Sequence, residues 1–123
     1  AQSLLLKHNV MIKYITGNIL ESDAQALINT VNTVGVMGKG IALQFKKAYP
    51  FNFKSYIEAC ERNEIRIGSM FVVKDSNLES GEKFIINFPT KQDWRKPSEY
   101  LFIETGLDDL IKIIEEYCIY IRF

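Results

Sequence analysis

The fold is decided by the stretch Ala26-Leu-Ile-Asn-Thr-Val-Asn-Thr-Val-Gly35-Val-Met-Gly-Lys-Gly40, in which an apolar run leads into a glycine-rich segment. Residues 26–31 are predicted to form a buried strand, because apolar and β-branched side chains fill the run. Ile41, Phe45 and Ala48 follow at helical spacing, and Pro50 ends that pattern. A glycine-rich segment between a buried strand and a helix presents backbone N–H groups and a helix dipole to an anion.

The glycines from Gly35 to Gly40 follow the order G-x-x-G-x-G. This is neither a Walker A motif, which needs Ser or Thr after the lysine, nor the dinucleotide-binding G-x-G-x-x-G. Two interpretations stay open: a phosphate- or nucleotide-binding loop, and a flexible turn that leads into the helix. Asn29 and Asn32 at the end of the strand also allow two interpretations, since an amide can bind ribose hydroxyls or close an Asx turn.

Strands and helices alternate on both sides of this stretch. Before it, Ile12–Ile15 is predicted to be a strand, whereas residues 1–10 show no helical or strand period and are interpreted as a tag or extension. After it, the pattern predicts a helix over Phe53–Arg62, strands over Met70–Val73 and Phe84–Phe88 with a polar turn from Asp75 to Gly81, a helix from Ser98 to Tyr117, and a last strand starting at Ile119. This alternation predicts one α/β domain with a parallel or mixed sheet.

The long C-terminal helix carries an apolar stripe that is expected to face the core, made of Leu107, Leu110, Ile111 and Ile114. Gly106 lies inside this helix, and glycine costs about 1 kcal/mol in a helix interior. A break of the helix at Gly106 is therefore an open alternative.

Composition excludes several classes of protein. The 123 residues, 47% hydrophobic and 24% charged, suit one globular domain, and no apolar run approaches the roughly 20 residues that span a membrane. Because the net charge is zero, any contact with nucleic acid needs a local patch. Cys60 and Cys118 lie far apart and fit a cytoplasmic location rather than a disulfide scaffold or a zinc site. His8, the one histidine, leaves little basis for a histidine-dependent triad or metal site.

Longer matches identify a family. The segment from Asn29 to Lys46 resembles the signature loop of macrodomains, the ADP-ribose-binding family, and Thr16-Gly-Asn-Ile19 resembles the turn that they place at adenine. Phe88-Pro-Thr-Lys91, followed by Trp94-Arg-Lys-Pro-Ser98, is similar to the DarG-type branch of DNA ADP-ribosyl glycohydrolases. The resemblance implies a three-layer α/β/α fold with a mixed sheet, here missing the C-terminal strand-loop-helix part. Residues 11–123 are accordingly expected to form a single truncated macrodomain.

The resemblance also implies roles for the matching residues. Asn18 and Ile19 would contact adenine, and Asn32 would approach the distal ribose. The loop around the diphosphate and distal ribose would consist of Gly35, Val36, Met37, Gly38, Lys39 and Gly40. Lys91 matches the lysine that the family uses at the distal ribose C1″. No metal and no cofactor are implied beyond the ligand ADP-ribose.

Lys91 and the residues after it allow several kinds of chemistry. A desolvated lysine can lose its proton and attack an anomeric carbon to give a Schiff-base-type intermediate, whereas an ammonium can protonate a leaving group or stabilise charge. Most loop lysines are simply solvated. Trp94, Arg95 and Lys96 combine an aromatic ring with two cations, which suits a stacked base and a phosphate of single-stranded DNA. The alternative is a tryptophan packed on the next helix beside two solvated cations.

The function that the resemblance implies is hydrolysis of ADP-ribose from a nucleobase, thymidine in single-stranded DNA, by an antitoxin. Its partner would be a DNA ADP-ribosyltransferase toxin. Two alternatives stay open: an ADP-ribose-binding module without catalysis, and a glycohydrolase that acts on ADP-ribosylated protein carboxylates. The sheet edge left by the missing part is expected to be covered in a homodimer.

Overall fold

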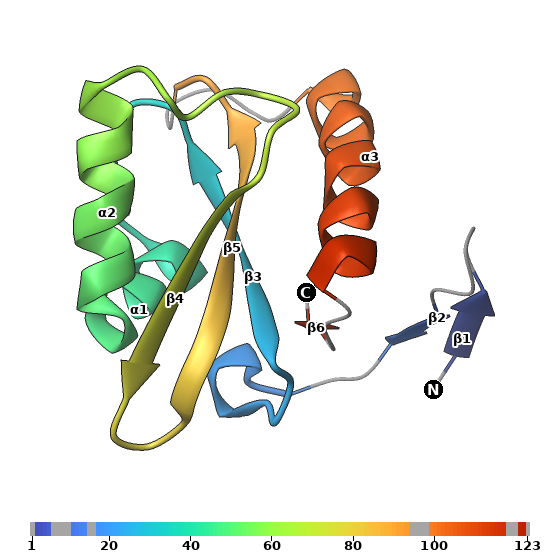
Figure 1. The fold of residues 1–123 in the computed structure, drawn as a ribbon. Helices are drawn as coiled ribbons and strands as arrows, with labels where there is room; N and C mark the ends of the chain where they lie inside the picture. The colour runs from blue at the N-terminus through green and yellow to red at the C-terminus, as the bar shows by residue number, and fades with distance from the viewer. Residues whose placement is uncertain (1, 6–10, 15–16, 94–98, 118–120, 123) are drawn as a thin grey trace.

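A mixed four-stranded sheet forms the centre of the molecule (Figure 1). The computed structural model describes residues 2–5, 11–14, 17–93, 99–117 and 121–122. The strand order is β4 (Phe71–Asn77), β5 (Gly81–Lys91), β3 (Ala26–Asn32) and β6 (Ile121–Arg122). β3 runs parallel to β5 and β6, whereas β4 runs antiparallel to β5. The strands predicted over residues 26–31 and 84–88 are confirmed, and the structure shows that they pair with each other at the centre of the sheet.

Helices cover both faces of the sheet (Figure 1). On one face lie α1 (Gly40–Ala48) and α2 (Pro50–Glu61), and on the other lies α3 (Tyr100–Tyr117). Successive side chains of a strand point to opposite faces. Leu27 of β3 therefore packs with Phe45 of α1, and Ile28 packs with Leu110 of α3. This arrangement confirms the expected three-layer α/β/α fold.

Several predicted boundaries are wrong. Residues 1–10 were expected to hold no strand, but β1 (Gln2–Leu5) pairs antiparallel with β2 (Met11–Tyr14). α2 begins at Pro50 rather than Phe53, because proline suits the first position of a helix. The predicted turn from Asp75 to Gly81 is shorter in the structure and covers residues 78–80, because β4 pairs with β5 as far as Asn77 opposite Gly81. Polar residues fit this strand because it lies at the edge of the sheet.

α3 runs without a break through Gly106, so the break that the sequence left open does not occur. A Cβ atom at position 106 would lie 2.5 Å from Cε1 of Phe88, which no carbon contact tolerates. Glycine thus lets the helix approach β5 closely enough to pack on the Phe88 ring. Of the predicted stripe, Leu110 is buried and Ile114 packs against the same core, but Leu107 is 38% exposed.

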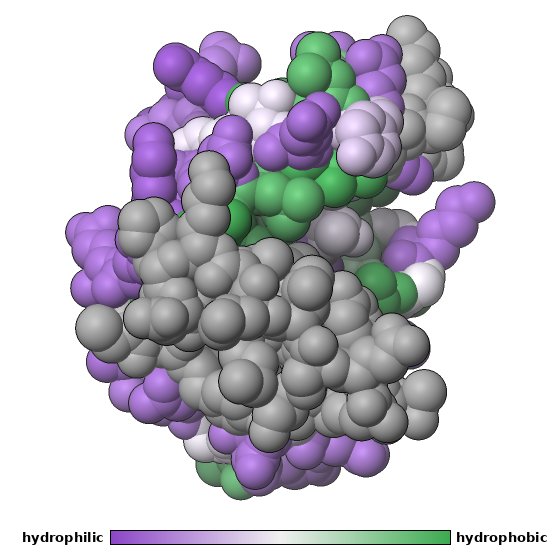
Figure 2. Space-filling model, turned by 90° about the vertical axis from the view of Figure 1, so that its right-hand side faces the viewer, coloured by the Kyte–Doolittle hydropathy of each residue, from purple (hydrophilic) through white to green (hydrophobic). Residues whose placement is uncertain are grey.

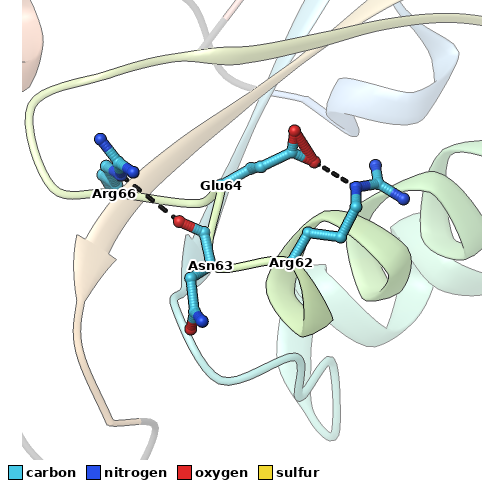
Figure 3. A network of polar contacts seen from close by, with 4 residues as sticks. All are labelled: Arg62, Asn63, Glu64 and Arg66. Carbon is cyan, nitrogen blue, oxygen red and sulfur yellow. Dashed lines mark hydrogen bonds and ion pairs between the residues drawn. The ribbon is translucent and has the colours of Figure 1, made fainter.

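α2 ends in a Schellman motif, and Figure 3 shows the side-chain contacts of the residues at this end of the helix. The N–H groups of Asn63 and Glu64 donate to the carbonyls of Cys60 and Ala59 at 3.0 and 2.8 Å, and Asn63 has a φ of +57°. Arg62 pairs with Glu64 through an exposed side-chain contact. This closed end fixes the length of α2, the helix that lies behind the glycine-rich loop.

α3 carries several exposed apolar side chains. They are Tyr100, Leu101, Ile103 and Leu107. In the view of Figure 2, apolar surface gathers in the upper half of the molecule, where α3 lies. None of the described helices is both long and apolar enough to cross a bilayer.

Candidate functional site

Asn32 organises the start of the glycine-rich loop. Its Oδ1 accepts hydrogen bonds from the backbone N–H groups of Val34, Gly35 and Val36 at 3.1, 3.0 and 3.2 Å. Its Nδ2 donates to the Val36 carbonyl at 2.7 Å, and the residue is only 5% exposed. The Asx turn, one of the two interpretations that the sequence left open for Asn32, is therefore present. Direct contact between this amide and a ribose stays a prediction.

The structure limits which backbone N–H groups of the loop are free to meet an anion, a role that stays a prediction. Because the N–H groups of residues 34–36 point at Asn32, this capacity falls to the segment from Met37 into the first turn of α1. Among the described residues, no side chain caps that helix at Lys39, and its first turn holds no acidic residue. The positive end of the helix dipole is thus left for an external anion.

Two predicted side chains anchor this region in the core. Met37 is 3% exposed and packs with Val31 and Tyr56, so only its backbone can face a ligand. Asn29 is fully buried, and its Nδ2 lies 3.8 Å from Sδ of Met37. The structure therefore gives Asn29 neither the ribose contact nor the Asx turn that the sequence allowed.

Lys91 lies beside Asn32, although the two motifs are far apart in the sequence. β3 and β5 pair in register up to Val31 and Pro89, and Asn32 then pairs with Lys91 after a bulge. Proline lacks the N–H that would continue the ladder, which explains why the register shifts here. Thr33 closes the junction, since its N–H donates to the Lys91 carbonyl and its Oγ1 to the Gln92 carbonyl, each at 3.0 Å. The predicted place of Lys91 at a strand end is confirmed, and its catalytic role stays a prediction.

Ile19 also reaches this region. It belongs to the 3₁₀ turn η2 (Ile19–Glu21) and lines an apolar hollow of about 300 Å³ with Ile28, Thr30 and Ile41. Asn18 behaves differently. Its Oδ1 caps η2 by accepting from the Leu20 N–H at 3.0 Å, and the residue lines a separate, polar hollow. Of the pair predicted for adenine, Ile19 is thus the one that lies beside the start of α1.

Tyr56 of α2 supports the loop from inside the protein. Its hydroxyl lies 2.8 Å from the carbonyl oxygen and 3.0 Å from Oδ1 of Asn32. Burial raises the pKa of Tyr56 above its ordinary value of 10.0, so the hydroxyl stays protonated and able to donate. Burial also raises the pKa of the neighbouring Cys60 thiol. The sequence analysis missed Tyr56, because its partner lies 24 residues away and its spacing marks only a core position.

Trp94, Arg95 and Lys96, the predicted DNA contact, lie outside the described residues. Across the part of the chain that is described, no group of three or more His, Cys, Asp or Glu side chains is placed to hold a metal ion.

The Macro domain family model matches residues 28–121. The chain belongs to the macrodomain family. A relative from Mycobacterium tuberculosis named DNA ADP-ribosyl glycohydrolase is 58% identical over 106 residues, which cover 86% of this chain and 30% of that protein. The chain thus spans less than a third of the length of this curated relative.

Solved macrodomain structures agree with this assignment. The macrodomain of M. tuberculosis DarG matches with a TM-score of 0.81 and 57% identity, over 86% of this chain and 69% of that one. Thermosipho africanus DarTG in complex with ADP-ribose matches with a TM-score of 0.80 and 30% identity, over 98% of this chain and 34% of that one. The resemblance to DarG-type macrodomains is therefore confirmed in both sequence and fold.

Proposed function

We propose that this chain binds ADP-ribose and hydrolyses it from a modified nucleobase, thymidine in single-stranded DNA. The observation that carries the proposal is the pairing of Asn32 with Lys91, which brings the glycine-rich loop and the candidate catalytic lysine to one end of the sheet. Ligands of α/β folds bind at the carboxyl ends of parallel strands. The names of the relatives, DNA ADP-ribosyl glycohydrolase and DarTG in complex with ADP-ribose, support the same assignment.

The ligand would lie across three features of this end. The diphosphate would meet the backbone from Met37 into the first turn of α1, where N–H groups and the helix dipole favour negative charge. Adenine would enter the apolar hollow between Ile19 and Ile41. The distal ribose would then lie at the junction of Asn32 and Lys91.

The reaction would break the N-glycosidic bond between C1″ of the distal ribose and the base nitrogen. As a free amine, Lys91 would attack C1″ while the bond to the base nitrogen breaks, and the base would take up the proton that the amine loses. Opening of the ribose ring would give a Schiff-base-type intermediate, and its hydrolysis by water would release ADP-ribose and restore the lysine. As an ammonium, Lys91 would instead protonate the leaving nitrogen while water attacks C1″. Both routes need no resident metal or cofactor. Lys91 is half-buried at a strand end, which allows contact with a ligand.

One experiment separates the proposal from its alternatives. The chain is incubated with an ADP-ribosylated single-stranded oligonucleotide and, in parallel, with a protein carrying ADP-ribose on carboxylates, and released ADP-ribose is measured. Release from the oligonucleotide alone supports the proposal. Release from the protein alone supports the carboxylate glycohydrolase, and calorimetric binding of ADP-ribose without release supports a binding module.

Further parts of the proposal concern context. Trp94, Arg95 and Lys96 would bind the DNA strand next to Lys91, and the partner would be a DNA ADP-ribosyltransferase toxin in the cytoplasm. If so, Trp94→Ala should lower turnover on ADP-ribosylated DNA while leaving the affinity for free ADP-ribose unchanged. Equal loss of both would place Trp94 in the ADP-ribose site itself.

A further inference from the structure

Tyr56 is buried behind the loop and cannot touch a bound ligand. Its exposed fraction is 0%, and its ring packs in the core with Val31, Met37 and Ala59. The hydroxyl nevertheless reaches the end of β3, where it faces both oxygens of Asn32 at 2.8 and 3.0 Å. A single buried donor is thus shared between the backbone and the side chain of the residue that starts the loop.

The second contact between α2 and the loop is at Gly35. This residue has a φ of +91°, and a Cβ atom there would lie 3.2 Å from Cδ1 of Ile57 and 3.6 Å from Cβ of Cys60. The loop therefore packs closely on α2 at Ile57 and Cys60, one and four residues after Tyr56. Since Oδ1 of Asn32 gathers the N–H groups of residues 34–36, the rotamer of Asn32 sets the direction of the chain toward Met37.

We infer that Tyr56 is a positioning residue for ADP-ribose, acting through Asn32. Its hydroxyl holds the Asn32 amide in the rotamer that turns the N–H groups of residues 34–36 inward and presents the segment from Met37 to the diphosphate. This inference rests on the proposed function, because the ligand that it concerns is ADP-ribose. Preorganisation of this kind lowers the entropy that binding must overcome.

The test compares Tyr56→Phe with Tyr49→Phe. Each variant removes one hydroxyl from a fully buried tyrosine, but the Tyr49 hydroxyl lies toward Ser80 and Asn77 rather than the loop, and its ring belongs to a different core cluster. By calorimetry, the Kd for ADP-ribose should rise about tenfold in Tyr56→Phe, the effect of losing one such hydrogen bond. The Kd should change less than about twofold in Tyr49→Phe.

Two further measurements separate positioning from a general loss of stability. In the free protein, amide exchange at residues 34–36 should speed up in Tyr56→Phe, while exchange in the central strands β3 and β5 is unchanged. In an Asn32→Ala background, Tyr56→Phe should change the Kd less than about twofold further, because the amide through which it acts is gone.

The outcomes distinguish the two proposals. If the unmodified chain binds ADP-ribose and Tyr56→Phe binds equally well, the inference is overturned and the proposed function stands. If the unmodified chain does not bind, the proposed function fails. In that case, amide exchange still tests the contact between Tyr56 and Asn32. An unchanged exchange rate at residues 34–36 in Tyr56→Phe would show that this contact does not stabilise the loop.

Discussion

At the scale of single residues, the chemistry of the site depends on where each side chain's hydrogen bonds go. Asn32 is the clearest case, because its Oδ1 serves three backbone donors and faces Tyr56 as well. Asn32→Ala leaves the three part-buried N–H groups without this acceptor and removes one of the two acceptors that face the buried Tyr56 hydroxyl. We expect the variant to lose about 1–3 kcal/mol of unfolding free energy and to weaken ADP-ribose binding about tenfold or more. Urea denaturation and calorimetry measure the two effects, and an unchanged Kd would contradict the role given to the loop.

Gly38 offers a test of the loop that does not involve the core. It is exposed, and a Cβ atom there would meet only Cγ1 of Val36 at an ordinary 3.5 Å. Gly38→Glu should therefore fold like the unmodified protein and still lose affinity for ADP-ribose, because its carboxylate repels the diphosphate. Gly38→Ala is the matched control and should bind nearly as well as the unmodified chain. Equal affinities of the two variants would place the diphosphate elsewhere.

Lys91 is the residue on which the proposed chemistry depends. Lys91→Ala should abolish release of ADP-ribose from modified DNA while leaving binding nearly intact, because most of the proposed contacts lie on the glycine-rich loop. Lys91→Arg should also be inactive, since a guanidinium stays protonated and cannot act as nucleophile or base. Turnover assays and calorimetry measure these effects.

Either of two results would change the assignment of Lys91. An active Lys91→Arg variant would show that only positive charge is needed. Full turnover by Lys91→Ala would remove the lysine from the mechanism and make Asp93 the next residue to replace.

At the scale of elements, the packing of α3 on β5 depends on one missing methyl group. Helix propensity alone favours Gly106→Ala by about 1 kcal/mol. The Phe88 ring nevertheless occupies the place of the new Cβ atom. We therefore expect Gly106→Ala to lower the unfolding free energy by about 1–3 kcal/mol, as overpacked cores do.

The matched control for Gly106→Ala is a change in the Phe88 ring that it would strike. In a Phe88→Leu background, Gly106→Ala should cost less, because the ring is gone. A stabilised Gly106→Ala single variant in chemical denaturation would disprove the close contact.

Local sequence patterns predicted some of the helices and strands correctly and failed at others. The buried strands over residues 26–31 and 84–88 were predictable, because unbroken apolar runs report burial on both faces. The ends of β4 and α2 were not, because pairing at a sheet edge and a proline at a first helical turn override local polarity. The continuity of α3 through Gly106 could not be predicted either, because the reason for this glycine is its contact with Phe88 of β5, which is distant in the sequence.

The candidate site likewise has features that local sequence motifs predicted and features that they could not predict. The loop from Gly35 to Gly40 and the strand-end position of Lys91 followed from local motifs. The inward turn of the N–H groups of residues 34–36 did not, because it depends on the rotamer of Asn32 and on a hydroxyl from α2. Long-range hydrogen bonds of this kind leave no periodic signal in a sequence.

At the scale of the whole molecule, an incompletely paired strand and exposed apolar side chains predict that the protein self-associates. β6 pairs with β3 only at Ala26 and Leu27, so in the described residues the ladder on that side of β3 stops before Ile28. Tyr100, Ile103 and Leu107 of α3 add exposed apolar area. We expect light scattering to show a dimer at high concentration, because open edges and apolar patches favour association.

A charge on the apolar face tests the proposed dimer directly. Leu107→Glu should shift the equilibrium toward monomer, whereas Asp108→Asn, on the neighbouring exposed position, should leave it unchanged. A stable monomer of the unmodified chain at high concentration would contradict the prediction.

The parallel pairing of β3 with β5 also has a consequence for how the candidate site is assembled during folding. The contact between Thr33 and Gln92 joins residues that are 59 positions apart in the sequence. The entropy of such a closure is lost before the pairing returns any stability, so non-local strands join late during folding. A chain still emerging from the ribosome has its glycine-rich loop long before its lysine. The site therefore forms only when the sheet is complete. A ligand that needs both segments can stabilise the folded protein, but it cannot bind to earlier folding intermediates and direct their folding.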